Sequence, residues 1–216
     1  YNYRVVADGC IDIVFNCTNY DETYIMGYCN SFVKIGIDKE FNYFGIRFLP
    51  GIFPSLFNID ASELSNHYER LNTVQPCIYN VIQQSKDRCL CLQDLCDELN
   101  IYFIKHINKI DKPFDNRFFC ALETILKSKG SIIIEKDLND GISSRHLQRL
   151  FNFYIGDTAK SFCRIVRFQN LLKIDPSVKL IKSEKSYYDF GYYDQTHFIK
   201  EFKLFYGKTP LKIAAE

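Results

Sequence analysis

The C-terminal half of this chain contains the same pattern twice, at an offset of 51 residues. The first copy is His146-Leu147-Gln148-Arg149-Leu150-Phe151, then four residues, then Gly156-Asp157-Thr158. The second copy is His197-Phe198-Ile199-Lys200-Glu201-Phe202, then four residues, then Gly207-Lys208-Thr209. A glycine (Gly141, Gly191) and then a polar residue suited to cap a helix (Ser143, Asp194) precede each copy. This spacing predicts two helix-turn-helix units, and a pair of such units typically binds DNA.

Helical periodicity divides the first copy into two faces. Leu147, Leu150 and Phe151 fall on an apolar face, which is expected to pack on Ile134, Leu138 and Ile142 of the preceding segment. The opposite face carries Arg145, Gln148 and Arg149. Arg pairs with guanine and Gln with adenine, each contributing roughly 1–3 kcal/mol of discrimination between bases. These three side chains are therefore predicted to contact bases, and Ser143, at the helix start, is predicted to lie near a phosphate.

The second copy follows the same rule. Phe198, Phe202 and Phe205 form its apolar face, and the predicted DNA contacts are Gln195, Thr196, His197 and Lys200. Between the copies, a predicted helix from Thr158 to about Lys173 would be ~24 Å long. It would hold two recognition helices about one DNA turn, ~34 Å, apart. One such helix with exposed Arg and Gln is usually only a solvated surface, but the matched duplication favours a DNA-binding role.

Charge is distributed unevenly along the chain. Residues 1–112 contain 10 Lys and Arg against 14 Asp and Glu, a net charge of −4, whereas residues 113–216 contain 17 against 12, a net charge of +5. The repeat therefore lies in the basic half, as contact with phosphates requires.

The N-terminal half predicts a different class of structure. Apolar residues alternate with polar ones at 11–15 and 44–48, which indicates an antiparallel sheet or partial barrel. Short helices are expected at about 54–71, and longer ones at 76–86 and 89–108, the last with an apolar stripe of Leu92, Leu95, Leu99, Phe103 and Ile107. Asp111-Lys112-Pro113 interrupts the pattern. The expected fold is α+β, with a sensor-like or dimerisation domain at 1–112 and an all-α double helix-turn-helix domain at 113–216.

The repeat resembles the AraC/XylS-type bacterial transcription regulators over about residues 131–213. The matching segments are 143–151, 158–168, Gly191-Tyr192-Tyr193-Asp194-Gln195-Thr196-His197-Phe198 and Gly207-Lys208-Thr209-Pro210. The resemblance implies base-reading roles for the residues named above and RNA polymerase as a partner. The N-terminal half is expected to sense a small-molecule effector or to mediate formation of a homodimer through the 89–108 helix. Residues 8–12, 45–51 and 59–64 resemble, more weakly, a sensor-like β domain. One departure is Tyr187, which stands where the family usually has a small residue, with Ser186 at a usually apolar position. The bulky ring either pushes the two helices apart, so that a partner or ligand sets the second unit, or is accommodated by repacking.

Other functions are less well supported by the sequence. The number of cysteines, nine, is odd and no apolar signal segment opens the chain, so reduced thiols in the cytoplasm are expected. No apolar run approaches the ~20 residues needed to cross a bilayer, so no membrane partner is expected. The spacing of Cys89, Cys91 and Cys96 is not that of a structural zinc site. Buried thiols are therefore expected, and no bound metal or cofactor is expected. The motifs of hydrolases, P-loop enzymes, dinucleotide-binding enzymes and zinc proteases are all missing, so an enzyme is not expected.

Two alternatives stay open. Arg47 is either the anchor of a carboxylate ligand or an exposed or ion-paired residue. The whole chain is either the DNA-binding regulator described above or a ligand- or thiol-sensing protein that binds a partner and has little affinity for DNA.

Overall fold

The N-terminal half is built on antiparallel strands. The computed structural model describes residues 2–36, 42–86, 88, 91–110, 114–138, 141–174 and 186–213. The larger sheet has the order β5 (Tyr43–Phe48), β2 (Ile11–Asn16), β3 (Asn19–Met26) and β6 (Tyr68–Arg70). A separate pair joins β1 (Asn2–Val5) to β4 (Val33–Gly36). The predicted alternation is confirmed in β2, where Ile11, Ile13 and Phe15 are buried and Asp12, Val14 and Asn16 are not.

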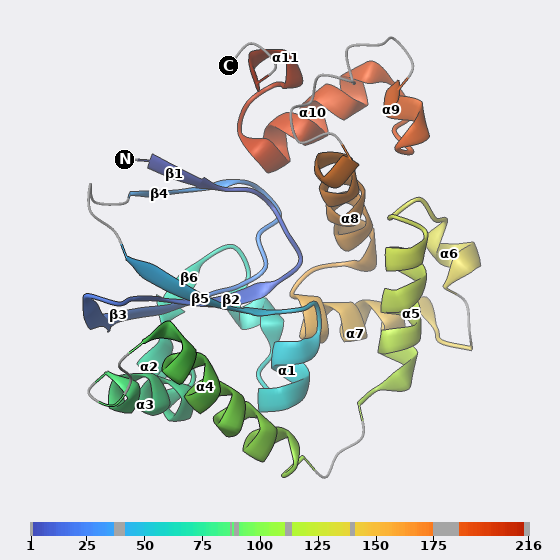
Figure 1. Cartoon of the computed structure of the whole chain (residues 1–216). Coiled ribbons are helices and arrows are strands. Elements are labelled where there is room, and N and C mark those ends of the chain that lie inside the picture. The colour runs from blue at the N-terminus through green and yellow to red at the C-terminus, as the bar shows by residue number, and fades with distance from the viewer. Residues whose placement is uncertain are drawn as a thin grey trace.

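Short helices cover one face of the larger sheet. They are α1 (Ile52–Phe57), the 3-10 turn η1 (Ala61–Leu64), α2 (Leu71–Val74), α3 (Pro76–Ser85) and α4 (Leu92–Ile107). Figure 1 shows α2, α3 and α4 together below the strands. Ile13, Phe15 and Ile25 of the sheet share a core with Ile78 and Leu95 of these helices.

Two details differ from the sequence-based expectation for this half. The region predicted to be helical at 54–71 ends in strand β6, whose three residues are all exposed and pair with the edge of β3. With no buried residue, β6 has no alternation that a sequence pattern could reveal. In α4, Leu95 and Leu99 are buried, but Leu92 and Ile107 at the two ends of the predicted stripe are exposed, because the apolar core takes in the helix at Leu95, Leu99 and Phe103 and neither of its end residues.

The C-terminal half is helical throughout the residues that the structure describes. Its helices are α5 (Asn116–Lys127), α6 (Ile134–Asp137), α7 (Ser144–Ile155), α8 (Ala159–Ile174), α9 (Ser186–Asp189), α10 (Gln195–Tyr206) and α11 (Pro210–Ile213). In Figure 1, α8 runs from the level of α7 at one end to the level of α10 at the other. This arrangement confirms the expected α+β fold, with two helix-turn-helix units joined by a connector helix.

The two repeat helices begin and end in the same way. The Ser143 side chain accepts a hydrogen bond from the His146 backbone N–H at 3.3 Å, and Asp194 accepts one from His197 at 2.7 Å. Gly156 and Gly207 end the helices with φ values of 95° and 87°, in the left-handed region that glycine adopts without strain. The sequence repeat is therefore also a repeat of helix boundaries.

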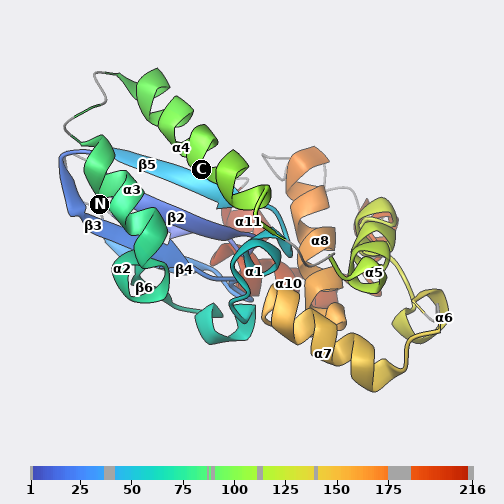
Figure 2. The same cartoon turned by 90° about the horizontal axis from the view of Figure 1, so that it is seen from below.

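The two halves of the chain are in direct contact, as the view in Figure 2 also shows for α1 and α7. Ala7 and Tyr28 of the N-terminal half belong to the main core cluster of the helical half. The predicted boundary at 111–113 lies outside the described residues, so the division into domains at 1–112 and 113–216 stays a prediction.

Candidate nucleic-acid interface

The first recognition helix, α7, has one buried and one open face. Leu147, Leu150 and Phe151 are buried, and the Phe151 ring meets the ring of Phe118 at 5.3 Å between centroids. The predicted contact residues Ser143, Arg145, Gln148 and Arg149 are all exposed. With His146 and Asn152 they line one shallow hollow of about 470 Å³. The structure thus brings together all four residues that the sequence predicted for this unit.

Arg149 is held in place by a neighbour on the same helix. A guanidinium nitrogen of Arg149 lies 3.2 Å from Nδ1 of His146. Arginine has no acceptor, so Nδ1 must accept the hydrogen bond, and the proton of a neutral ring sits on Nε2. That Nε2 is buried and has no hydrogen-bond partner within the described part of the chain. His146 therefore supports the position of Arg149 in the hollow.

The second recognition helix, α10, packs on a cluster of aromatic rings. Phe198, Phe202 and Phe205 are buried, as predicted, and Tyr192 before the helix is 2% exposed. Tyr187 is also buried, and its ring is nearly parallel to that of Phe198, with 6.3 Å between centroids and 8° between planes. The bulky ring is thus accommodated as a stacked layer of the core; the side chain of Ser186 lies outside the described residues.

The predicted contact residues of this unit are placed differently from one another. Gln195, Thr196 and Lys200 are exposed. His197 is half-buried, and its Nε2 donates to Oε1 of Glu201 at 3.1 Å. Its Nδ1 is buried without a partner among the described residues. In this conformation both ring nitrogens of His197 face the protein.

Glu201 was not among the residues predicted from the sequence. It is 4% exposed, and the same Oε1 also accepts a hydrogen bond from Nε of Arg164 on the connector helix. One carboxylate therefore joins α8 to α10 and orients His197. The available signal was an acidic residue beside the apolar positions 198, 202 and 205, four residues after a histidine.

A second hollow, of about 570 Å³, lies between α6, α8 and α10. Four cations line it, namely Lys160, Arg164, Arg167 and Lys200, together with the acids Glu135 and Glu201. Arg167 also lies over the Tyr192 ring at 5.4 Å and donates to the carbonyl oxygen of Gly130 at 3.1 Å. A concave surface with an excess of positive side chains is suited to bind the phosphates of a nucleic acid.

Arg47 lies far along the chain from these surfaces and is bound by two acids. Its guanidinium is 2.9 Å from Oδ2 of Asp8, and it forms two hydrogen bonds with Asp12 at 2.9 and 2.6 Å. The bidentate bond with Asp12 raises the pKa of Arg47 further above its ordinary value. The geometry is that of an ion-paired residue, and its role as a ligand anchor stays a prediction.

The cysteines are dispersed. Cys29 and Cys163 are buried, Cys91 is exposed, Cys96 is half-buried, and Cys89 lies outside the described residues. Within the described ranges, no three His, Cys, Asp or Glu side chains are grouped to hold a metal ion.

Comparison with known protein families agrees with this geometry. Residues 140–215 match a family model described as a helix-turn-helix domain, and residues 1–70 match one described as a domain of unknown function (DUF6597). No curated protein and no solved structure matches the chain. Across the part of the chain that the structure describes, no helix has both the length and the apolar character needed to cross a membrane. The matched helix-turn-helix domain contains the residues of α7 and α10 that line the two hollows. This match points to DNA binding rather than to an enzyme.

Proposed function

Since this chain is a DNA-binding transcription regulator that carries the AraC-type helix-turn-helix domain at residues 140–215, we propose that it binds one DNA duplex with two recognition helices. Helix α7 enters one major-groove segment and α10 enters the next. Arg145, Gln148 and Arg149 read bases in the first segment, and Gln195, Thr196 and Lys200 contact the second, with His197 at its edge. Phosphate contacts by Ser143 and the surrounding cations set the position of the protein on the duplex.

The observation that carries this proposal is the open outer face of both recognition helices. Within the described residues, hydrogen bonds from the N-terminal half reach these helices at their C-terminal ends, at Gly156 of α7 and at Leu204 and Phe205 of α10. Arg145, Gln148, Arg149, Gln195 and Lys200 are all exposed in the same conformation. No rearrangement of the N-terminal half is therefore needed to free these side chains.

The connector helix supports simultaneous binding by both units. Helix α8 has 16 residues and is ~24 Å long. Recognition helices that enter successive major grooves on one side of a duplex are one turn, ~34 Å, apart, which this connector and the width of the two helices can span. Because the two units differ in sequence, the binding site is expected to be asymmetric rather than palindromic.

A selection of bound sequences from random duplex DNA tests the proposal. At a stated salt concentration we expect one enriched site with two specified segments about ten base pairs apart. Enrichment of no sequence would overturn sequence-specific binding and favour the alternative of a ligand- or thiol-sensing partner-binding protein.

Single variants then assign each segment to its helix. Arg149→Ala is expected to weaken binding by roughly 5- to 150-fold and to relax specificity in one segment, because a base contact is lost. Lys200→Ala is expected to weaken binding through the other segment. Lys86→Ala removes an exposed cation from the N-terminal half and serves as the control. If Arg149→Ala and Lys200→Ala both bind the selected site like the control, the assignment of the two helices is wrong.

The N-terminal half is proposed to modulate this binding. Support comes from its contacts with both helix-turn-helix units and from a sequence match at residues 1–70 to a domain typical of AraC-type regulators. A small-molecule effector and a homodimer formed through α4 are parts of the same proposal, together with the contact with RNA polymerase that the resemblance implies. The exposed Ile101 and Ile104 on α4 are compatible with a dimer contact.

A further inference from the structure

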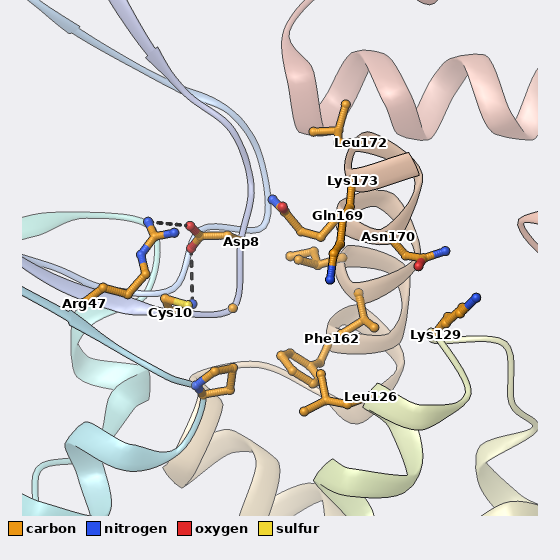
Figure 3. Close-up of a pocket in the computed structure, with 14 residues that line it drawn as sticks. Asp8, Cys10, Arg47, Leu126, Lys129, Phe162, Gln169, Asn170, Leu172 and Lys173 are labelled. Atoms are coloured by element: carbon orange, nitrogen blue, oxygen red, sulfur yellow. Dashed lines mark hydrogen bonds and ion pairs between the residues drawn. The ribbon is translucent and has the colours of Figure 1, made fainter. Parts of the chain in front are cut away.

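A cleft of about 600 Å³ separates the N-terminal half from the connector helix. One wall is formed by residues 8–10 with Arg47 and Pro50, and the other by α8 and the C-terminal end of α5 (Figure 3). We propose that this cleft is the binding site of a small amphipathic anion, with an apolar body against α8 and an acidic group at Lys173. The regulatory part of this inference rests on the proposed function; the binding site itself does not.

The floor of the cleft is apolar. Leu126, Phe162 and Val166 line it from α5 and α8, and Leu126 remains 46% exposed. Apolar side chains exposed in a concave site of this size favour an organic ligand, because its binding removes their surface from water. A hydrated inorganic ion would leave that surface uncovered.

The charges that face the cleft select an anion. Figure 3 shows the side chain of Lys173 pointing down along α8 into the cleft, whereas the side chain of Lys129, which also lines it, points away from Asp8. Among the described residues, neither amino group lies within 4.0 Å of a carboxylate. Arg47 is already neutralised by Asp8 and Asp12. Among the described residues that line the cleft, the two lysines are therefore the cations without a carboxylate partner, and the acidic group of the ligand is assigned to Lys173, which lies over the apolar floor.

The remaining polar groups of the cleft do not favour a cation or a metal. Burial raises the pKa of the Asp8 carboxyl. This carboxyl forms its ion pair with Arg47. Burial also raises the pKa of the Cys10 thiol to about 12, so this thiol is neutral near pH 7. Asp8 is the one acid among the described residues that line the cleft.

A ligand in this cleft would contact the connection between the two halves. Gln169 on α8 donates a hydrogen bond to the carbonyl oxygen of Ala7 at 2.5 Å. Gly9 lies so close to the Phe162 ring that a Cβ atom at position 9 would overlap it. A ligand between Asp8 and Lys173 would therefore shift or stabilise the placement of the N-terminal half against α8, the helix that spaces the two recognition helices. Ligand binding and DNA binding are then coupled in both directions.

A pair of fluorescent probes tests the site in the full chain. The anion 8-anilinonaphthalene-1-sulfonate and the uncharged N-phenyl-1-naphthylamine share an aromatic body and differ in the sulfonate. We expect saturable binding of one equivalent of the anion and clearly weaker binding of the uncharged probe. Equal affinity for both probes, or binding without saturation, would overturn the anion site.

Variants locate the probe. Lys173→Ala is expected to weaken anion binding about five-fold and to leave binding of the uncharged probe unchanged. The control Lys127→Ala removes an exposed lysine of α5 that pairs with Glu123 at 2.6 Å and does not line the cleft. Val166→Phe is expected to reduce binding of both probes by filling the floor. If Lys173→Ala binds the anion as tightly as Lys127→Ala does, the acidic group is not at Lys173 and the inference fails.

The coupling is measured with the selected DNA site. Saturating anion is expected to change the Kd for DNA at least about three-fold, and DNA to change the Kd for the anion by the same factor. An unchanged Kd overturns the regulatory part. Failure of the DNA selection would overturn the proposed function while leaving the probe measurements interpretable.

Discussion

Glu201 shows how one buried residue can define a recognition helix. It lies among the aromatic side chains that hold α10, yet its carboxylate contacts Arg164 of the connector and His197 of its own helix. A buried carboxylate is costly unless it is paired, and removal of one partner leaves the others unsatisfied. The pairing therefore fixes the rotation of α10 relative to α8.

Two substitutions separate charge from hydrogen bonding at this position. Glu201→Ala is expected to lower the free energy of unfolding by about 3 kcal/mol and to weaken DNA binding through the second segment. Glu201→Gln keeps an acceptor for Arg164 and His197 and is expected to retain most of the segment specificity. Urea unfolding and binding to sites altered in either segment measure both effects. Wild-type stability and specificity in Glu201→Ala would show that the carboxylate does not position the helix.

The cysteines make a prediction about pH. Burial raises the pKa of Cys29 and of Cys163 to about 11, so at pH 8 only about one molecule in a thousand carries the reactive thiolate at either position. Their reaction with a disulfide reagent should accelerate about ten-fold per pH unit below pH 11, from a very low rate. Exposed Cys77, Cys91 and Cys120 should react first, as peptide mapping would show. Early modification of Cys29 and Cys163 in the folded protein would contradict their burial.

At the scale of elements, the junction of η1 and α7 ties the N-terminal half to the first recognition helix. Gly156 ends α7 with a φ of 95°, and its carbonyl oxygen accepts a hydrogen bond from Ser65 Oγ at 2.8 Å. A Cβ atom at position 156 would lie 2.8 Å from the carbonyl oxygen of Ala61. Glycine is required here both by the backbone angle and by the close approach of η1.

Substitution of two glycines with positive φ separates the effect of the backbone angle from the effect of the close approach of η1. Gly141→Ala, at a φ of 74° with nothing near the new methyl group, is expected to cost about 1 kcal/mol through backbone strain alone. Gly156→Ala adds the displacement of η1 and is expected to cost about 3 kcal/mol. Denaturant unfolding of both variants gives the difference. Equal costs would mean that η1 does not press on the end of α7 in solution.

At the scale of the whole molecule, the N-terminal half spans both helix-turn-helix units. Tyr28 bonds to Ser161 at 2.9 Å, next to the first unit. The backbone N–H groups of Ala7 and Phe32 donate to Phe205 and Leu204 at the end of the second unit, at 3.1 and 3.0 Å. These bonds hold the first turn of α8 and the C-terminal end of α10 to the N-terminal half, so the spacing of the recognition helices depends on that half.

Amide hydrogen exchange tests this dependence. The amides of Ala7 and Phe32 are expected to be protected as strongly as those in the middle of α10, because all of them open only when the shared core opens. Fast exchange at Ala7 and Phe32 beside a protected α10 would show that the N-terminal half detaches while the second unit stays folded.

The parts of the fold that followed from the sequence are those governed by local rules. The faces of α7 and α10, their capping residues Ser143 and Asp194, and the glycines that end them are set by helical periodicity and by backbone angles, which neighbouring residues determine. The exposure of Arg149 and Lys200 follows from the same periodicity. Their contact with DNA remains a prediction that binding experiments must test.

Other features depended on partners that are distant in the chain. Strand β6 exists because β3 offers an unpaired edge, and Leu92 is exposed because α4 extends beyond the surface that covers it. His197 looked like an outward residue by its helical angle, but its nitrogens face inward because Arg164, 33 residues earlier, brings Glu201 into the same network.

The amino-acid sequence alone determined that this protein has two matched helix-turn-helix units, because helix faces, caps and ends depend on residues within a few positions of one another. Only the tertiary structure decided how these units are held, with Ala7 and Phe32 bonded to the end of α10, Tyr28 bonded to the first turn of α8, and a cleft between the N-terminal half and α8. The physical reason is that such contacts join side chains and backbone groups more than a hundred residues apart, and no local pattern records them.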